Sequence, residues 1–308
     1  MSSPKGSKLM TQSPSARPSV SESILIMDFG SQYSRLIARR IREANVYCEL
    51  ISPHTEWETL SKLNAKGVIL SGGPASVYSL DAPVAPDWVY SQKLPVLGIC
   101  YGMQLLTSQM GGSVEPAEMR EYGHAKLMHD ANHPILKGIT DETTVWMSHG
   151  DRVTKLPEGF KPLAHTLNSS IAIMGNNDNM IGLQFHPEVA HTQEGSKLLN
   201  NFLFDICKCT GDWTPGNFVT QAIEDLRSTI GAGKVICALS GGVDSAVVAT
   251  LIHRAVGTQL TSIFVDNGLL RKDESIRIQD MFAKHFDMKI IHVKAEDEFL
   301  DNLKGVTD

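Results

Sequence analysis

Residues 96–106 read "VLGICYGMQLL", two apolar runs separated by a segment that contains two glycines, a cysteine and a tyrosine. The first run predicts a buried strand over 94–100, and the second predicts a helix that begins near Tyr101. The spacing of Gly98, Cys100 and Gly102 is typical of a sharp turn from strand to helix that exposes its central side chain, since small flanking residues let the backbone approach itself closely. A strand that runs directly into a helix is the basic unit of an α/β fold.

Cys100 has two interpretations. A free cysteine is most often a buried thiol at the end of a strand. At the start of a helix, however, unpaired N–H groups and the positive end of the helix dipole favour the thiolate over the thiol. Because the thiolate is the nucleophilic form of cysteine, the glycine spacing favours Cys100 as a nucleophile.

Similar strand and helix units lie on both sides of Cys100. Residues 24–30 and 66–73 predict further buried strands, and residues 31–45 predict a helix whose start is capped by a serine. Between 113 and 190, shorter apolar segments separated by Asn, Asp and Gly predict antiparallel or mixed strands that extend the sheet. With a helix over 195–208, these elements predict a first α/β domain over residues 23–208.

A second series of elements follows a predicted linker over 209–218, which contains one proline and two glycines. Helices are predicted over 218–231, 245–257 and 273–286, and strands over 234–240, 260–268 and 289–293. Residues 295–308 predict a helix or loop without a closing strand, so residues 219–308 predict a partial α/β domain. The first 22 residues, rich in Ser and Pro, predict a disordered tail.

Composition limits the classes of partner. The chain has 308 residues, 42% of them hydrophobic, and a net charge of −6, which predicts no nucleic-acid partner. No apolar stretch is long enough to cross a bilayer, so no membrane partner is expected. The five cysteines are odd in number and scattered, which indicates a reducing, cytoplasmic location. Cys207 and Cys209 are not predicted as metal ligands, because no matching Cys or His pair follows them.

Two segments of the first domain could assist a nucleophile. His186 and Glu188 lie two residues apart in "QFHPE", so their side chains can point the same way and the carboxylate can hold the imidazole tautomer. "SGGP" (71–74) follows a strand, and its backbone N–H groups, with that of Tyr101, could stabilise an oxyanion. Alternatively, Glu188 is a helix cap and Gly-Gly-Pro is a common turn. His149 in "SHGD" is a candidate pocket residue, whereas His54, His165 and His191 are predicted to be surface or hydrogen-bonded histidines.

The second domain contains "LSGGVDSAVV" (239–248) between a predicted strand and a predicted helix. Successive N–H groups at such a helix start form a cradle for an anion. The segment lacks the lysine of the nucleotide-binding loop G-x-x-x-x-G-K-[ST], which argues against transfer of a γ-phosphate. Asp244 would repel a bare phosphate, so it predicts a Mg²⁺ shared with pyrophosphate.

"GICYGMQ", "HPE" and "SGGP" together resemble the class I glutamine amidotransferases over residues 23–208. The resemblance implies a flavodoxin-like domain in which Cys100 attacks the side-chain amide of glutamine, His186 transfers the proton and Glu188 orients His186. It further implies an oxyanion hole and contacts to glutamine. The residues implied for the oxyanion hole are Gly73 and Tyr101, and those for glutamine are Gln104 and Asp151.

The S-G-G-x-D-S string resembles the PP-loop of N-type ATP pyrophosphatases, which have an adenine nucleotide alpha hydrolase-like fold. That resemblance implies ATP binding by one continuous segment, with Val265 near the adenine and Mg²⁺ bound together with ATP. The segment comprises Ser240, Gly241, Gly242, Val243, Asp244, Ser245 and Ala246.

The order of the two domains, with "FVDNGLLR" at 264–271, resembles the glutamine-hydrolysing GMP synthases. It implies a ligase that adenylates XMP and aminates it with ammonia from glutamine, without a tightly bound organic cofactor. In that family a C-terminal region, expected to be missing here, forms a homodimer. Two alternatives stay open: a chain that acts only as a glutaminase subunit, and a non-catalytic regulatory remnant.

Overall fold

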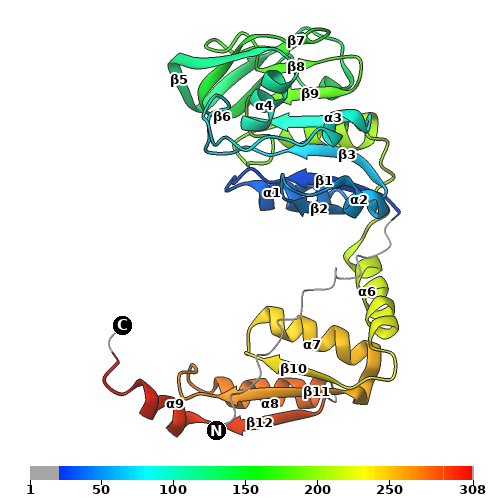
Figure 1. Cartoon of the computed structure of the whole chain (residues 1–308), viewed down its shortest axis with the longest axis vertical. Coiled ribbons are helices and arrows are strands. Elements are labelled where there is room, and N and C mark those ends of the chain that lie inside the picture. The colour runs from blue at the N-terminus through cyan, green and yellow to red at the C-terminus, as the bar shows by residue number, and fades with distance from the viewer. Residues whose placement is uncertain (1–20, 287, 307–308) are drawn as a thin grey trace, which may run out of the picture. The chain divides into compact units, whose positions relative to one another are not determined.

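The computed structural model describes residues 21–286 and 288–306, and the chain divides into two compact units between Thr214 and Pro215. The first unit contains a seven-stranded sheet with the order β2-β1-β3-β4-β9-β8-β7. In Figure 1, the labels β2, β1, β3, β9, β8 and β7 follow this order. Its strands are β1 (Ser23–Met27), β2 (Cys48–Ile51), β3 (Ala65–Leu70), β4 (Val96–Ile99), β7 (Lys161–Ala164), β8 (Ile173–Gly175) and β9 (Met180–Leu183).

The first five strands in that order are parallel, β8 pairs antiparallel with β9, and β7 pairs antiparallel with β8. The order β2-β1-β3-β4-β9 is the 2-1-3-4-5 order of flavodoxin-like sheets. The expected α/β fold is therefore confirmed for this unit. In such sheets, ligands bind outside the carboxyl ends of the strands, where β4 leads into Cys100.

Both faces of this sheet are buried. Ile24 and Ile26 of β1 belong to one apolar cluster, and Leu25 and Met27 belong to another. Alternate residues of a strand point to opposite faces, so a strand covered on both sides must be apolar at every position. The helices of this unit are α1 (Ser34–Glu43), α2 (Trp57–Leu60), α3 (Trp88–Ser91), α4 (Tyr101–Gln109) and α5 (Gly195–Asn200), the last followed by a π-helical turn over Asn201–Ile206.

Three expectations need correction. Strands β5 (Ser113–Met128) and β6 (Glu142–Lys155) pair with each other in a separate two-stranded sheet, so residues 143–149 do not extend the main sheet. The predicted serine cap is wrong, because the N-cap of α1 is Tyr33 and no side chain caps the helix. Glu22, at the end of the predicted tail, is buried and accepts hydrogen bonds from the N–H groups of Thr210 and Gly211. Residues 1–20 of that tail lie outside the described residues.

The second unit contains a parallel three-stranded sheet with the order β10-β11-β12. Its elements are α6 (Pro215–Ile230), β10 (Val235–Leu239), α7 (Val243–Val256), β11 (Leu260–Asp266), α8 (Glu274–Phe286), β12 (Ile290–Lys294) and α9 (Glu296–Leu303). Helix α6 begins inside the stretch predicted as linker, since proline is well tolerated at the first position of a helix. Among the described residues, no helix is long and apolar enough to span a bilayer.

Candidate active site

Cys100 lies at the junction of β4 and α4 with φ 53° and ψ −105°. The turn is tight because a Cβ atom on Gly98 would lie 2.5 Å from the carbonyl oxygen of Gly102, and one on Gly102 would overlap the carbonyl of Leu70. The N–H of Cys100 donates to the carbonyl oxygen of Leu183 at the end of β9. The predicted elbow, with its need for small flanking residues, is present.

His186 and Glu188 form a buried pair beside this elbow. His186 Nδ1 lies 2.7 Å from Glu188 Oε1, and their side chains are 6% and 0% exposed. Since a carboxylate oxygen accepts, Nδ1–H is the donor and Nε2 is the nitrogen available to Cys100. Glu188 Oε2 has no hydrogen-bond partner among the described residues, so the hydrogen bonding of this carboxylate is directed at His186.

Burial lowers the pKa of His186, but hydrogen bonds to Cys100 and Glu188, together with the charges of both groups, raise this pKa to about 10. The thiol group of Cys100 also lies 3.5 Å from the carbonyl oxygen of Ser148. The Cε1 atom of His186 and the Cβ atom of Cys100 lie 3.2 and 3.9 Å from the Cβ position of Gly72, so both side chains border the same point. The arrangement can therefore place an imidazolium next to the sulfur.

A cavity of about 600 Å³ opens at Cys100. The residues predicted for the oxyanion hole and for glutamine all line it: Gly73, Tyr101, Gln104 and Asp151. The N–H of Gly73 has no hydrogen-bond partner in the described part of the chain. The first N–H groups of α4, which begins at Tyr101, lack intrahelical partners. Free N–H groups beside the nucleophile are what an oxyanion hole requires, and Gly73 and Tyr101 line the same cavity as Cys100.

Gln104 and Asp151 contact each other. Gln104 Nε2 donates to the main-chain oxygen of Asp151 over 2.9 Å. The carboxylate of Asp151 accepts hydrogen bonds from Ser76 Oγ over 2.6 Å and from Tyr78 Oη over 2.7 Å. One wall of the cavity is therefore a connected polar network in which two hydroxyl groups hold the side chain of Asp151 in place.

Several polar residues of the site were not predicted. Arg120 and Tyr122 of β5 line the cavity together with Ser76 and Tyr78, and Gln184 Nε2 lies 4.0 Å from Cys100 Sγ. Only Gln184 had a local signal, because it opens the "QFHPE" segment. The others are brought to the cavity by folding of distant segments, and sequence spacing does not record that. His149, a candidate pocket residue, does line the cavity.

In the second unit, the PP-loop segment joins β10 to α7. Gly241 has φ 82°, and Gly242 is the N-cap of α7. Ser245 Oγ accepts from the N–H of Ser240, and Ser240 Oγ accepts from the N–H of Gly242. These bonds fold the loop around the helix start, where backbone N–H groups favour an anion.

This loop offers one carboxylate, that of Asp244, as a ligand for Mg²⁺. Asp244 lies in the first turn of α7, and the described residues contain no cluster of three or more His, Cys, Asp or Glu that could hold a metal. Mg²⁺ commonly binds through one or two carboxylates together with phosphate oxygens, so a single aspartate fits an ion that arrives with a nucleotide.

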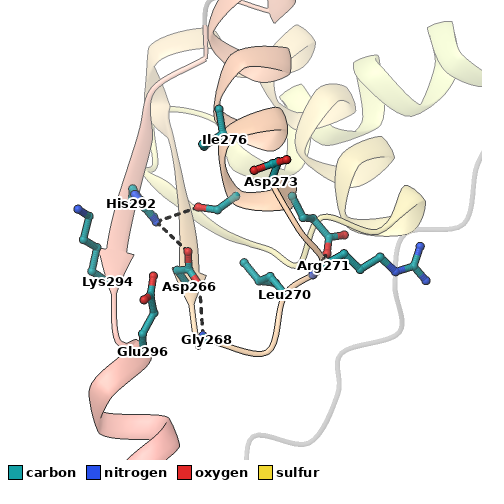
Figure 2. Close-up of a pocket in the computed structure, with 11 residues that line it drawn as sticks. Asp266, Gly268, Leu270, Arg271, Asp273, Ile276, His292, Lys294 and Glu296 are labelled. Atoms are coloured by element: carbon teal, nitrogen blue, oxygen red, sulfur yellow. Dashed lines mark hydrogen bonds and ion pairs between the residues drawn. The ribbon is translucent and has the colours of Figure 1, made fainter.

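Two cavities lie in this unit, and one of them is lined by part of this loop. One of about 530 Å³ is lined by Gly241, Gly242, Val243 and Ala246 together with apolar residues of α7 and α8. The other, of about 550 Å³, lies at the carboxyl ends of β11 and β12 and is drawn in Figure 2. Val265 is 40% exposed and lines neither cavity. The position predicted for the adenine is thus at the surface of β11.

The cavity in Figure 2 is lined mostly by charged groups. Asp266 accepts a hydrogen bond from the N–H of Gly268 and lies 3.9 Å from His292 Nε2. Glu274 connects this cavity with the PP-loop, since its Oε1 atom is 3.7 Å from the Cβ position of Gly241. The cavity and the PP-loop both lie at the carboxyl edge of the same parallel sheet, which is the usual place for ligands.

Comparison with known proteins agrees with this geometry. The family described as glutamine amidotransferase class-I matches residues 25–206, and the family described as NAD synthase matches residues 217–304. The chain is 58% identical over 292 residues to a glutamine-hydrolysing GMP synthase of Dehalococcoides mccartyi, and the match covers 94% of this chain and 55% of the relative. A GMP synthase of Thermomicrobium roseum is 55% identical over 287 residues, and the match covers 93% of this chain and 54% of that relative.

Among solved structures, a Thermoplasma acidophilum protein that is described provisionally as one of the subunits of a GMP synthase is 28% identical, with a TM-score of 0.53. That similarity covers 60% of this chain and 94% of the other. The chain thus spans about 55% of the length of the curated relatives it matches. Because the amidotransferase match takes in more than half of the 308 residues and contains the Cys100 elbow and the His186–Glu188 pair, the chain belongs to the class-I glutamine amidotransferase family.

Proposed function

We propose that the chain carries the glutaminase and part of the synthetase of a glutamine-hydrolysing GMP synthase. The buried His186–Glu188 pair, which lies beside Cys100 at a strained elbow, is the observation that carries the glutaminase half. The relatives of 55–58% identity, and the PP-loop in its strand-to-helix context, support the synthetase half.

In the proposed reaction, Cys100 Sγ attacks the side-chain amide carbon of glutamine. The N–H groups at Gly73 and Tyr101 stabilise the negative oxygen. His186 gives its proton to the leaving nitrogen. Ammonia then departs, and the glutamyl group remains bound to Cys100 as a thioester. Water then attacks the thioester with His186 as base, and glutamate leaves with Cys100 restored. Gln104 and Asp151 help to hold the glutamine.

The ammonia is the amine donor for the second reaction. ATP adenylates the C2 oxygen of XMP with release of pyrophosphate, ammonia attacks C2, and AMP departs to leave GMP. Residues 240–246 hold the pyrophosphate portion of ATP, with Val265 near the adenine. Mg²⁺ held by Asp244 would neutralise phosphate charge when bound. A cytoplasmic location and a homodimer formed through further parts of the relatives belong to the same proposal.

One observation favours a simpler alternative. The match to the Thermoplasma acidophilum protein covers 94% of that protein but 60% of this chain, so a related protein can exist without the remaining part. On that alternative, the chain releases ammonia for a separate synthetase.

The test is Cys100→Ala. We expect it to abolish formation of glutamate from glutamine, measured by amino-acid analysis. In the full-length gene product, we expect GMP synthesis from XMP, ATP and added ammonia to continue at the parent rate. Glutamine hydrolysis that survives the substitution would overturn the role of Cys100. Failure of added ammonia to support GMP synthesis in the unsubstituted protein would favour the glutaminase-only alternative.

A further inference from the structure

Glu121 of β5 and His149 of β6 form a buried ionisable pair that the proposed reaction does not use. They stand directly opposite each other in the strand register, and Nε2 lies 3.2 Å from Oε2. Their side chains are 8% and 3% exposed. Burying two ionisable groups costs free energy unless each is well paired, so the contacts of this pair indicate what it holds in place.

The pair is connected to the cavity wall through the main chain of Asp151. His149 Nδ1 lies 3.0 Å from the carbonyl oxygen of Asp151. The same oxygen accepts the hydrogen bond from Gln104 Nε2. Gln104 Nε2 is also 3.5 Å from Gln184 Oε1, and Gln184 Nε2 is the group near Cys100 Sγ. A continuous chain of polar contacts therefore runs from Glu121 to the nucleophile.

The proton positions on His149 follow from its partners. A carbonyl oxygen can only accept, so Nδ1 carries a hydrogen. Nε2 faces a carboxylate oxygen, and two lone pairs at 3.2 Å would repel, so a second proton lies between His149 and Glu121. Thr166 Oγ1 donates to Glu121 Oε1 over 3.1 Å and accepts from the N–H of Ser169. Both ring nitrogens of His149 are thus engaged within the protein, and neither is available to a ligand.

The segment that this pair fixes is itself part of the cavity wall. Residues 148–151 all line the cavity, and the carbonyl oxygen of Ser148 accepts from the Cys100 thiol. A shift of this segment would move Asp151 and Gln104 together, whereas the contact between His186 and Glu188 is made outside this segment.

We propose that Glu121 and His149 are positioning residues that set the affinity of the cavity for glutamine and leave the chemistry at Cys100 to the triad. This inference rests on the proposed glutaminase function. Truncation of Glu121 would free the ring of His149 and leave it buried with an unpaired nitrogen. The 148–151 segment would then lose the contact that holds it against Gln104.

The experiment measures glutamine binding by titration calorimetry in the full chain carrying Cys100→Ala, where turnover cannot interfere. Adding Glu121→Ala should weaken binding about tenfold or more, the size expected for a buried hydrogen-bonded contact. Glu121→Gln should stay within about threefold of the parent, because its carboxamide can donate to His149 Nε2 and accept from Thr166. The matched control is Glu115→Ala, an exposed carboxylate on the same strand, which should bind glutamine as the parent does.

A second measurement separates positioning from damage to the fold. With Cys100 intact, Glu121→Ala should raise KM for glutamine by the same factor and change kcat less than about threefold. If that variant does not fold, Thr166→Val, which removes one hydrogen bond to Glu121, should raise KM about threefold.

Two results would overturn the positioning role of Glu121 and His149 and leave the proposed function standing. One is parent-like glutamine binding in Glu121→Ala, and the other is a loss of glutamine binding in Glu121→Gln as large as in Glu121→Ala. Hydrolysis retained in Cys100→Ala would overturn the role of Cys100 in the proposed function and leave the role of the pair in glutamine binding standing. Absence of any glutamine binding in the Cys100→Ala parent would overturn both.

Discussion

At the residue scale, Cys100 shows how backbone strain and chemistry coincide. Its φ of 53° with ψ −105° lies outside the regions that non-glycine residues favour, which costs roughly 1–3 kcal/mol. Such a conformation persists only when its surroundings enforce it. Here the N–H of Cys100 is held by Leu183 over 2.7 Å, and two glycines allow the backbone of β4 and α4 to close around it.

Gly102→Ala tests that explanation. The added Cβ atom would overlap the carbonyl of Leu70, which belongs to the buried strand β3 and has no room to move. We expect the free energy of unfolding of the first unit to fall by about 3 kcal/mol, together with loss of glutaminase activity. Urea unfolding followed by tryptophan fluorescence measures the stability.

The control for this substitution is Gly123→Ala. Gly123 has a positive φ of 96°, whereas Gly102 does not, and no atom lies within 4 Å of the Cβ position of Gly123. The only expected cost is backbone strain of about 1 kcal/mol, with activity retained. A loss in Gly102→Ala no larger than the loss in Gly123→Ala would contradict the approach of Leu70 as the reason that Gly102 is required.

The residues of the site differ in how far the sequence could predict them. Cys100, His186 and Glu188 stand in short segments whose spacing has a chemical reason, and the structure brings all three together. Arg120 and Ser76 reach the same cavity from segments 44 residues apart in the sequence, and no local pattern marks them. Their placement depends on the folding of separate segments around one cavity, which periodicity does not determine.

At the element scale, predictions succeeded where one face or both faces of an element are buried. β1, β3 and β4 are short apolar runs, and all three lie in the parallel sheet as expected. β5 and β6 were read as shorter strands of that sheet, because their exposed positions carry polar residues that resemble turn signals. Their pairing into a separate hairpin follows from contacts between the two strands, and the single-strand pattern does not contain that information.

The start of α5 depends on Glu194, whose carboxylate joins this helix to the loop at Thr140. Its Oε1 pairs with Lys197 Nζ at 2.7 Å, and its Oε2 accepts from the N–H and Oγ1 of Thr140. Burial raises the pKa of Glu194, but the hydrogen bonds from Lys197 and Thr140 outweigh it and lower this pKa from 4.5 to about 2. A carboxyl with a depressed folded-state pKa stabilises the fold above its ordinary pKa, and that contribution disappears as pH falls toward 2.

Glu194→Gln should therefore lower the free energy of unfolding by about 1–2 kcal/mol at neutral pH, because it removes charge-assisted hydrogen bonds. The difference from the parent should shrink as pH falls from about 5 to about 2, as measured by urea unfolding at each pH. Glu142→Gln is the control. Its ion pair with Lys126 joins side chains that are 59% and 58% exposed, and its loss should cost under about 0.5 kcal/mol. A difference for Glu194→Gln that stays constant to pH 2 would contradict the assigned contacts.

At the scale of the whole molecule, the two units differ in how their sheets are covered. In the first unit, separate apolar clusters cover both faces of the sheet. In the second, Phe264 and Leu239 pack into a core on one face, whereas the opposite face is exposed. Its exposed residues include Ile236 at 72%, Ile291 at 43% and Val265 at 40%. Parallel sheets normally bury both faces, so the second unit has the weaker hydrophobic stabilisation.

We therefore expect residues 19–214 alone to unfold in one cooperative transition at the temperature of the main transition of the whole chain, measured by scanning calorimetry. The core of the first unit needs no residue of the second unit, because every buried member of its two apolar clusters lies between residues 24 and 209. The whole chain should show an additional transition at lower temperature and should bind an apolar dye such as ANS, since contiguous exposed apolar surface attracts such ligands. The shorter chain should lose both signals. If ANS binding persisted in residues 19–214, or if their unfolding lost cooperativity, the stability of the first unit would depend on residues 215–308 and the division of the core would be wrong.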